Sequence, residues 1–293
     1  MAGLPFVLSV IGRDGIEAYA ESIRGMIGAA ERVAWLAQGR AFDLSFAGDA
    51  EAVLKAARAM AGAARLDINV VPAAKRRKKL LIADMDSTII GCECLDEIAD
   101  LAGLKDRVAP ITEAAMRGEM EFEPALRQRA TLLKGLPVET MARVYDDRVR
   151  LNPGARALVA TMRANGAHTM LVSSGFRYFT QRVAQDCGFE TEQANVLLER
   201  DGAFTGEVVE PILGRDAKLR ALEAAVAELG IDFDDVLAVG DGANDLAMIA
   251  RAGLGVAWHA KPILAAAASA VIVHGDLTSL LYLQGYREDD IRG

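Results

Sequence analysis

The sequence has few residues that bind metals through sulfur or imidazole, and too few cysteines for a disulfide framework. It contains three cysteines, Cys92, Cys94 and Cys187, with no CxxC pair among them, and three histidines. This sparse, odd set of cysteines provides neither a disulfide framework nor a zinc signature. Because reduced thiols are the rule in the cytosol, we expect a cytoplasmic protein.

Long apolar runs and excess positive charge are also missing. No stretch has the roughly 20 apolar residues that a membrane-spanning helix needs. The apolar segment 4–11 has no Lys or Arg ahead of it, so we expect a strand there and not a signal peptide. The formal net charge of -8 and the pI of about 5.1 oppose general binding to nucleic acid or to an acidic membrane surface.

What the chain does contain falls into two parts. The first part, residues 4–72, has strand and helix patterns in the order βαββαβ, which is typical of a small α+β ferredoxin-like domain. The basic segment 72–81 has the composition of a solvated linker. We therefore predict one domain at residues 1–74 and a second at residues 75–293. The expected strands lie at 4–12, within 31–47 (two strands) and at 65–72, and the expected helices at 15–28 and 49–63.

From residue 79 onwards, short apolar strands alternate with helices, which predicts an α/β doubly wound sheet. Residues 92–150 interrupt this alternation with helices alone. We expect them to form a helical cap inserted after the first strand, above the carboxyl edge of the sheet, where α/β proteins bind ligands. Segment 196–209 predicts a β-hairpin that turns at Asp201-Gly202. The expected strands lie at 79–84, 167–172, 235–239 and 270–273, and the expected helices at 153–165, 176–187, 215–229 and 244–252.

Two acidic residues, Asp84 and Asp86, directly follow the first strand of this second part. Carboxylates two residues apart on an extended chain point to the same side, so together they could hold a hard cation. One of them could also attack phosphorus while the other transfers a proton. The alternative is that Asp86 or Ser87 caps the start of a helix.

A second acidic cluster follows another apolar strand, at residues 240–245. Asp241, Asn244 and Asp245 offer oxygen ligands suited to Mg²⁺, although a plain turn before a helix uses the same residue types. We expect this loop and the loop after Asp84 to meet, since both follow strands of one sheet.

Two weaker signals concern phosphate binding. Ser173, Ser174 and Gly175 follow a third strand and provide a hydroxyl and backbone N–H groups at a strand-to-helix junction. Lys218 lies near a helix start and could neutralise a phosphoryl oxygen, although alone it has the character of a surface residue. Combined with the two acidic loops at one sheet edge, these residues would supply the functional groups that phosphoryl transfer requires.

The four motifs together resemble the haloacid dehalogenase (HAD) superfamily, and within it the phosphoserine phosphatase family. They are DMDST at 84–88, LVSSGF at 171–176, Lys218 and VGDGANDLAM at 239–248. The resemblance covers residues 80–280 and implies a Rossmann-like core with a helical cap. It further implies Mg²⁺ as cofactor, phosphorylation of Asp84, and proton transfer by Asp86. The implied metal ligands are Asp84, Asp86 and Asp241, supported by Asp245 and Asn244.

The resemblance extends into the expected cap. In phosphoserine phosphatases a Glu and an Arg hold the amino acid part of the substrate, and Glu93 and Arg129 stand at the matching positions. A carboxylate can hold an ammonium group, and a guanidinium can bind a carboxylate through two hydrogen bonds. The alternative is that both are ordinary charged helix residues. Where many relatives have two glycines this chain has Ser174 and Gly175, which leaves the role of Ser174 open. The implied substrate-binding residues are Glu93, Arg129, Ser173, Ser174, Gly175, Lys218 and Asn244.

Residues 1–74 resemble ACT domains, which often bind amino acids and pair between subunits, and this implies a homodimer. No residue with a predicted role in the chemistry precedes residue 80. We therefore expect a fragment that starts near Lys75 to fold and stay active, unless the two domains share a large apolar face. Two other functions stay open: a HAD phosphatase or phosphotransferase acting on another small phosphate ester, and an amino acid-binding regulator with an inactive phosphatase body.

Overall fold

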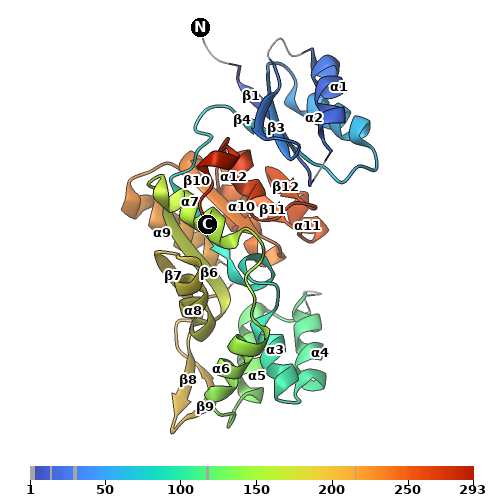
Figure 1. Cartoon of the computed structure of the whole chain (residues 1–293). Helices are drawn as coiled ribbons and strands as arrows, with labels where there is room; N and C mark the ends of the chain where they lie inside the picture. The colour runs from blue at the N-terminus through green and yellow to red at the C-terminus, as the bar shows by residue number, and fades with distance from the viewer. Residues whose placement is uncertain (1–3, 14, 29–31, 117–118, 215) are drawn as a thin grey trace.

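The computed structural model describes residues 4–13, 15–28, 32–116, 119–214 and 216–293. Figure 1 shows three layers along the long axis of the molecule: a small α+β unit at the amino terminus, a parallel sheet with its helices, and a group of helices at the far end. Within the described ranges, no helix is long and apolar enough to cross a membrane.

The amino-terminal unit is a four-stranded antiparallel sheet with two helices on one face. Its elements follow the βαββαβ order that the sequence predicts, and its strands lie in the spatial order β2-β3-β1-β4. Asp49 begins the second helix by accepting hydrogen bonds from the backbone N–H groups of Glu51 and Ala52. The bounds are β1 (Phe6–Ile11), α1 (Glu17–Ile27), β2 (Ala34–Ala37), β3 (Ala41–Phe46), α2 (Ala50–Ala61) and β4 (Asp67–Pro72).

The central layer is a six-stranded parallel sheet in the order β12-β11-β10-β5-β6-β7. This confirms the predicted α/β class. Two of its strands, β7 and β11, were not predicted from the sequence. The strands are β5 (Leu80–Asp84), β6 (His168–Phe176), β7 (Thr191–Asn195), β10 (Val236–Gly240), β11 (Leu254–Trp258) and β12 (Ala270–Ile272). The helices are α7 (Ala155–Ala164), α8 (Arg177–Cys187), α9 (Ala217–Leu229), α10 (Leu246–Arg251), α11 (Pro262–Ala265) and α12 (Ser279–Leu283).

The third layer is built from four helices that leave the sheet after β5 and return before α7. The two connections run side by side, since Gly91 N–H donates to the Arg150 carbonyl (3.1 Å) and Asn152 N–H donates to the Ile89 carbonyl (2.8 Å). The helices are α3 (Cys94–Leu101), α4 (Lys105–Met116), α5 (Phe122–Leu132) and α6 (Glu139–Arg148).

The sequence predicts that residues 92–150 alone form this layer, but a hairpin from a distant part of the chain also contributes to it. The predicted hairpin is present as β8 (Leu197–Arg200) and β9 (Ala203–Val208), with Asp201-Gly202 at its turn. It packs against α5, and the N–H groups of Gly135 and Val138 donate to carbonyls of Phe204 and Gly202. The hairpin therefore forms part of the same layer, although it lies far away in the sequence.

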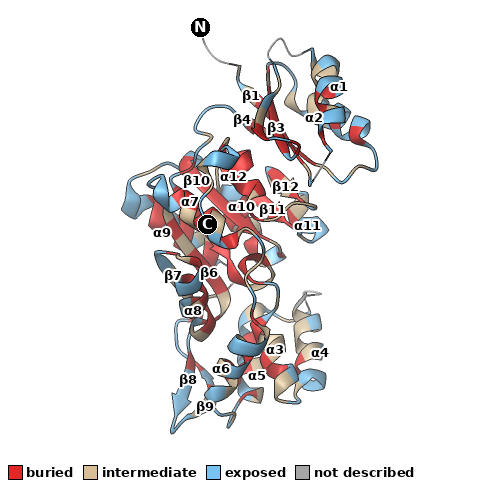
Figure 2. Cartoon of the chain, viewed as in Figure 1, coloured by how far each residue is buried: buried red, intermediate tan, exposed pale blue. Residues whose placement is uncertain are grey.

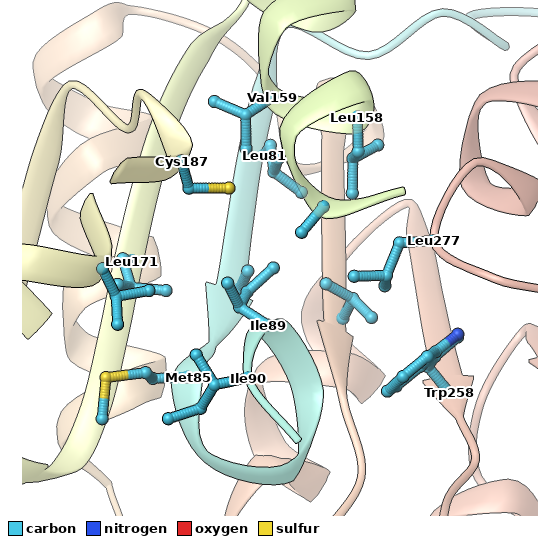
Figure 3. Packing of buried hydrophobic residues seen from close by; sticks show 14 of the residues in the cluster. Leu81, Met85, Ile89, Ile90, Leu158, Val159, Leu171, Cys187, Trp258 and Leu277 are labelled. Atoms are coloured by element: carbon cyan, nitrogen blue, oxygen red, sulfur yellow. The ribbon is translucent and has the colours of Figure 1, made fainter. Parts of the chain in front are cut away.

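A large apolar cluster fixes the loop that leaves β5 (Figure 3). Leu81 lies within this strand, and Met85, Ile89 and Ile90 follow it; all four are fully buried against the side chains of α7 and the segment around Leu277. Figure 2 shows burial across the whole chain, with buried residues concentrated in the central sheet. Because apolar residues alternate with Asp84 and Asp86 along this segment, their burial holds the two carboxylates in place.

The amino-terminal sheet is buried on both faces. Along β1, Leu8 and Val10 pack under the two helices, whereas Val7 and Ile11 join the apolar cluster of the central layer, where α12 contacts β1. The two sheets also meet at their edges, because the side-chain amide of Asn69 pairs with the backbone of the edge strand β12. The interface therefore combines apolar packing with specific hydrogen bonds.

Candidate active site

Asp84 ends β5 and is 4% exposed. Its Oδ1 accepts a hydrogen bond from Met85 N–H (2.8 Å) and lies 2.7 Å from Lys218 Nζ. Its Oδ2 has no hydrogen-bond partner among the described residues. Lys218 lies in the first turn of α9, is 3% exposed, and also donates to Asp245 Oδ1 at 2.6 Å. Asp84 thus has one fixed carboxylate oxygen and one that is available for reaction.

Asp86 is held from two sides. Its Oδ1 accepts from Cys94 N–H (2.9 Å), the first residue of α3, and its Oδ2 accepts from the Ser173 hydroxyl (3.0 Å). The helix-capping interpretation is therefore partly right, since Asp86 satisfies a free amide at a helix start and also borders the candidate site. Gly175 N–H donates to Ser173 Oγ (2.9 Å), and a Cβ atom at position 175 would lie 3.1 Å from Asp86 Oδ2. A side chain there would be a tight fit and would push Asp86 or Ser173 aside by a few tenths of an ångström.

The second acidic loop lies beside Asp84. Carboxylate oxygens of Asp84, Asp241 and Asp245 lie within 4.8 Å of one another. Asp245 is already satisfied, because its Oδ2 accepts from the N–H groups of Asp241 (3.2 Å) and Gly242 (3.1 Å) while its Oδ1 binds Lys218. Asp241 accepts one long hydrogen bond, from the Thr88 hydroxyl at 3.3 Å. Asp84 and Asp241 therefore hold the oxygens that are free for a cation, and Asp245 orients them.

The charges of this cluster fit a divalent cation. Burial raises the pKa of Asp84 well above its usual value, and the charge of Asp245 raises it further, although Lys218 acts in the opposite direction. Burial also raises the pKa values of Asp86 and Asp241. One buried lysine thus faces the buried Asp84 and Asp245, with the half-buried Asp86 and Asp241 nearby, which leaves negative charge for a bound cation to neutralise. The donors are all oxygens, which is the ligand type that hard divalent cations prefer.

A cavity of about 420 Å³ opens in front of these residues, between the sheet edge and the helical layer. Glu93 and Arg129 reach it from the helical layer, and Leu95, Phe122 and Leu126 provide an apolar wall. Its volume is in the usual range for small-molecule sites.

The two charged residues of the helical layer, Glu93 and Arg129, make few or long hydrogen bonds within the described residues. Glu93 accepts from the Ser87 hydroxyl (2.6 Å), and burial, followed by the nearby Asp86, raises its pKa to about 7. Among the described residues Arg129 makes only long hydrogen bonds, to the Ala125 carbonyl (3.3 Å) and the Thr112 hydroxyl (3.4 Å), and burial lowers its pKa. Neither group has all of its hydrogen bonds made by the part of the chain that the structure describes, so both can contact a ligand.

The structure brings the residues singled out from the sequence together. Lys218 and Asp245 lie directly behind Asp84. The others line the cavity: Asp84, Asp86, Glu93, Arg129, Ser173, Ser174, Gly175, Asp241 and Asn244. Sequence reasoning missed Lys261 and Ile263, which also line it. They follow β11, and a polar loop after a short apolar strand was the signal that could have identified them.

Comparisons with known proteins agree with this geometry. The family model described as haloacid dehalogenase-like hydrolase matches residues 81–250. A phosphoserine phosphatase from Polaromonas sp. is 47% identical over 210 residues, which is 70% of this chain and 89% of that protein.

Two solved structures extend the likeness to the fold. A HAD family hydrolase from Salmonella enterica serovar Typhi has a TM-score of 0.86 at 28% identity and covers 95% of this chain and 97% of its own. A substrate-bound phosphoserine phosphatase has a TM-score of 0.66 at 38% identity and covers 70% of this chain and 98% of its own. The family match spans more than half of the chain, and the chain therefore belongs to the haloacid dehalogenase-like hydrolases.

Proposed function

We propose that the chain hydrolyses O-phospho-L-serine to L-serine and phosphate through a phosphorylated Asp84. The observation that carries this is the single cavity lined by Asp84 and Asp86 on one side and by Glu93 and Arg129 on the other. The relatives and the substrate-bound structure named as phosphoserine phosphatases support the same substrate.

In the first step, the free Oδ2 of Asp84 attacks phosphorus. The new bond joins Asp84 to phosphorus, and the bond from phosphorus to the serine oxygen breaks. Asp86 donates a proton to that departing oxygen, so it must be protonated at this point. Burial raises the pKa of Asp86, which favours the protonated form.

In the second step, Asp86 is ionised and accepts a proton from a water molecule that attacks phosphorus. The bond between phosphorus and Asp84 breaks, and phosphate leaves. Throughout, Lys218, the Ser173 hydroxyl and the backbone N–H group of Ser174 stabilise charge on the phosphoryl oxygens, while the Gly175 N–H holds the Ser173 hydroxyl in place. The helical layer excludes other water from the cavity.

The divalent metal in this proposal is Mg²⁺. Asp84, the backbone carbonyl of Asp86 and Asp241 would hold it, with Asp245 and Asn244 in support. When bound, it supplies positive charge against the phosphoryl oxygens. This assignment is supported by the oxygen-only donor set and by the excess of buried carboxylates over cations.

Glu93 and Arg129 select the substrate. In the proposed complex Glu93 holds the ammonium group of phosphoserine, and Arg129 holds its carboxylate. The apolar wall then packs against the remaining surface of the substrate.

For the amino-terminal unit we propose an ACT-like domain at residues 1–74 that pairs between two subunits. The antiparallel βαββαβ sheet supports the first part. Pairing stays a prediction, which light scattering can test.

One assay tests the proposed function. Phosphate release is measured from L-phosphoserine, L-phosphothreonine and a sugar phosphate, with Mg²⁺, with Ca²⁺ and with excess EDTA. We expect phosphoserine to give the highest kcat/KM and the activity to require Mg²⁺. A preference for the sugar phosphate would favour another small phosphate ester as substrate. Activity that persists in EDTA would overturn the metal assignment.

A further inference from the structure

The phosphate-binding loop is formed by an interruption in the parallel sheet. Strand β6 pairs with β7 at Val172 and Gln193 and again at Phe176 and Asn195. Four steps along β6 thus correspond to two steps along β7, so residues 173–175 bulge out of the ladder. Bulges of this kind recur next to active sites, because they redirect backbone groups. Here the bulge borders the cavity that also contains Asp84.

A bulge also has a cost, since it removes backbone groups from their ladder partners. The side chain of Asn195, at the end of β7, takes over this pairing. It is 2% exposed, and its Nδ2 donates to the Ser174 carbonyl at 2.9 Å. The carbonyl of the central bulge residue is thereby held away from the cavity wall that must attract an anion.

The same amide holds a second segment. Asn195 Nδ2 also donates to the Leu213 carbonyl (3.2 Å), and its Oδ1 accepts from Leu213 N–H (2.8 Å). Leu213 precedes Gly214, whose carbonyl accepts from Ala217 N–H (3.0 Å) at the start of α9. The next residue is Lys218, which contacts Asp84. One buried side chain therefore connects the phosphate loop to the helix start that presents Lys218.

We propose that Asn195 is a positioning residue for phosphoryl transfer. It fixes the spacing between the phosphate loop, which presents the Ser173 hydroxyl and the Ser174 N–H, and Nζ of Lys218. These are the donors assigned to the phosphoryl oxygens in the proposed function, on which this inference rests. It does not line the cavity and contacts neither substrate nor reacting atoms. Preorganised donors lose much of their effect when displaced, and a misplacement of about 1 Å can cost on the order of 100-fold in rate.

The opposite edge of the same sheet provides a matched control. Asn69 is 1% exposed, its Nδ2 donates to the Val271 carbonyl (3.0 Å), and its Oδ1 accepts from Val271 N–H (2.9 Å). It thus makes the same type of bond to the backbone of β12 that Asn195 makes beside β7, but away from the catalytic loops. Replacing either residue leaves buried backbone groups unpaired.

The test compares Asn195→Ala, Asn195→Asp and Asn69→Ala. We expect both alanine variants to lower Tm, and only the Asn195 variants to lower kcat, by about 10- to 100-fold. The aspartate keeps the shape and the acceptor for Leu213 N–H but loses the donor to Ser174. The loss of kcat should be equal for phosphoserine and p-nitrophenyl phosphate, because the two share only the phosphoryl group.

A second measurement is independent of turnover. Binding of inorganic phosphate in the presence of Mg²⁺, followed by calorimetry, should weaken in both Asn195 variants and stay unchanged in Asn69→Ala. If the wild-type protein binds phosphate but does not hydrolyse phosphoserine, the proposed function is wrong. Phosphate binding by the variants would still test the positioning role of Asn195. If Asn195→Asp matches wild type in kcat and phosphate binding, or if Asn69→Ala loses as much as Asn195→Ala, the positioning role is wrong.

Discussion

Two groups of buried aspartates in this molecule differ in how well the protein satisfies them. At the interface with the amino-terminal unit, Asp67 accepts hydrogen bonds from the N–H groups of Val273 (2.8 Å), His274 (3.1 Å) and Gly275 (2.8 Å). Asp43 binds Arg76 through two hydrogen bonds, at 2.5 Å and 2.9 Å. Both carboxylates are more than nine-tenths buried, and each has partners for both oxygens.

At the sheet edge, Asp84 and Asp245 are buried to a similar degree and Asp241 is half-buried, but the hydrogen bonding of Asp84 and Asp241 is incomplete among the described residues. Asp84 has a free oxygen and shares Lys218 with Asp245, and Asp241 accepts one long hydrogen bond. Burying a charge without full compensation costs free energy, so such a cluster persists where function requires it. A buried acid whose oxygens all have hydrogen-bond partners thus indicates a structural role, whereas a buried acid with a free oxygen indicates a catalytic or binding role.

The strongest test of this comparison exchanges one aspartate from each group for asparagine. Asp84→Asn should lower kcat by at least about 10⁴-fold, because an amide cannot attack phosphorus. Its Tm in EDTA should change little, since the weaker contact to Lys218 is offset by the loss of repulsion from Asp245 and Asp86. Asp67→Asn should do the reverse, with wild-type kcat and a lower Tm, since the amide loses an acceptor for the three N–H groups. Steady-state kinetics and thermal unfolding of the two variants decide the matter.

The next test concerns the substrate end of the cavity. Arg129→Ala should raise the KM for phosphoserine by the equivalent of about 2–5 kcal/mol of binding free energy, because a charge-assisted, partly buried contact to the carboxylate is lost. Phosphoethanolamine has the ammonium and phosphate groups but no carboxylate, so its KM should change far less. Equal changes for the two substrates would mean that Arg129 binds the phosphate or only supports the helical layer.

The interface predicts the behaviour of a truncated chain, and here the structure favours the alternative to our expectation from the sequence. Removing residues 1–74 would expose the apolar residues of the central layer that pack on β1 and β4, and would leave Arg76 without Asp43. We therefore expect a fragment from Lys75 to unfold at a lower temperature and to aggregate more readily than the full chain, while any folded fraction keeps its kcat. An equal Tm for both chains would show that the interface contributes little.

Much of the fold could be predicted because its signals are local. The strands β5, β6 and β10 are short apolar runs, and the acids of the site follow two of them directly. Strand β7, TEQAN, is polar because it forms an edge of the sheet, so hydrophobicity does not reveal it. Strand β11 contains Gly255, where a Cβ atom would lie 2.1 Å from the Ile249 carbonyl oxygen, and this constraint arises only from packing with α10.

The active site likewise contains residues that the sequence reveals and residues that it does not. Residues that follow a recognisable strand were found, whereas Lys261 was missed together with β11. Asn195 could not be found at all, because its partners, Ser174 and Leu213, come together only in the folded chain. Roles that depend on side-chain contacts to distant backbone groups leave no pattern in a single sequence.

The smallest expected effect concerns Glu93, an acid that shares the incomplete environment of the site. Its pKa is raised from 4.5 to about 7, first by burial and then by Asp86. The raised pKa means that the folded state favours the protonated form of Glu93. The group therefore contributes fully to the stability of the fold below its unfolded pKa of 4.5, and this contribution is lost as the pH rises through about 7.

Binding of an ammonium group by Glu93 requires the ionised form and has the opposite pH dependence. The ratio of kcat/KM for phosphoserine to that for phosphoglycolate, which has no ammonium group, should therefore fall by up to about tenfold between about pH 8 and about pH 6. Glu93→Gln should remove this dependence and raise Tm at the higher pH. A ratio that stays constant with pH in the wild-type chain would mean that Glu93 does not hold the ammonium group.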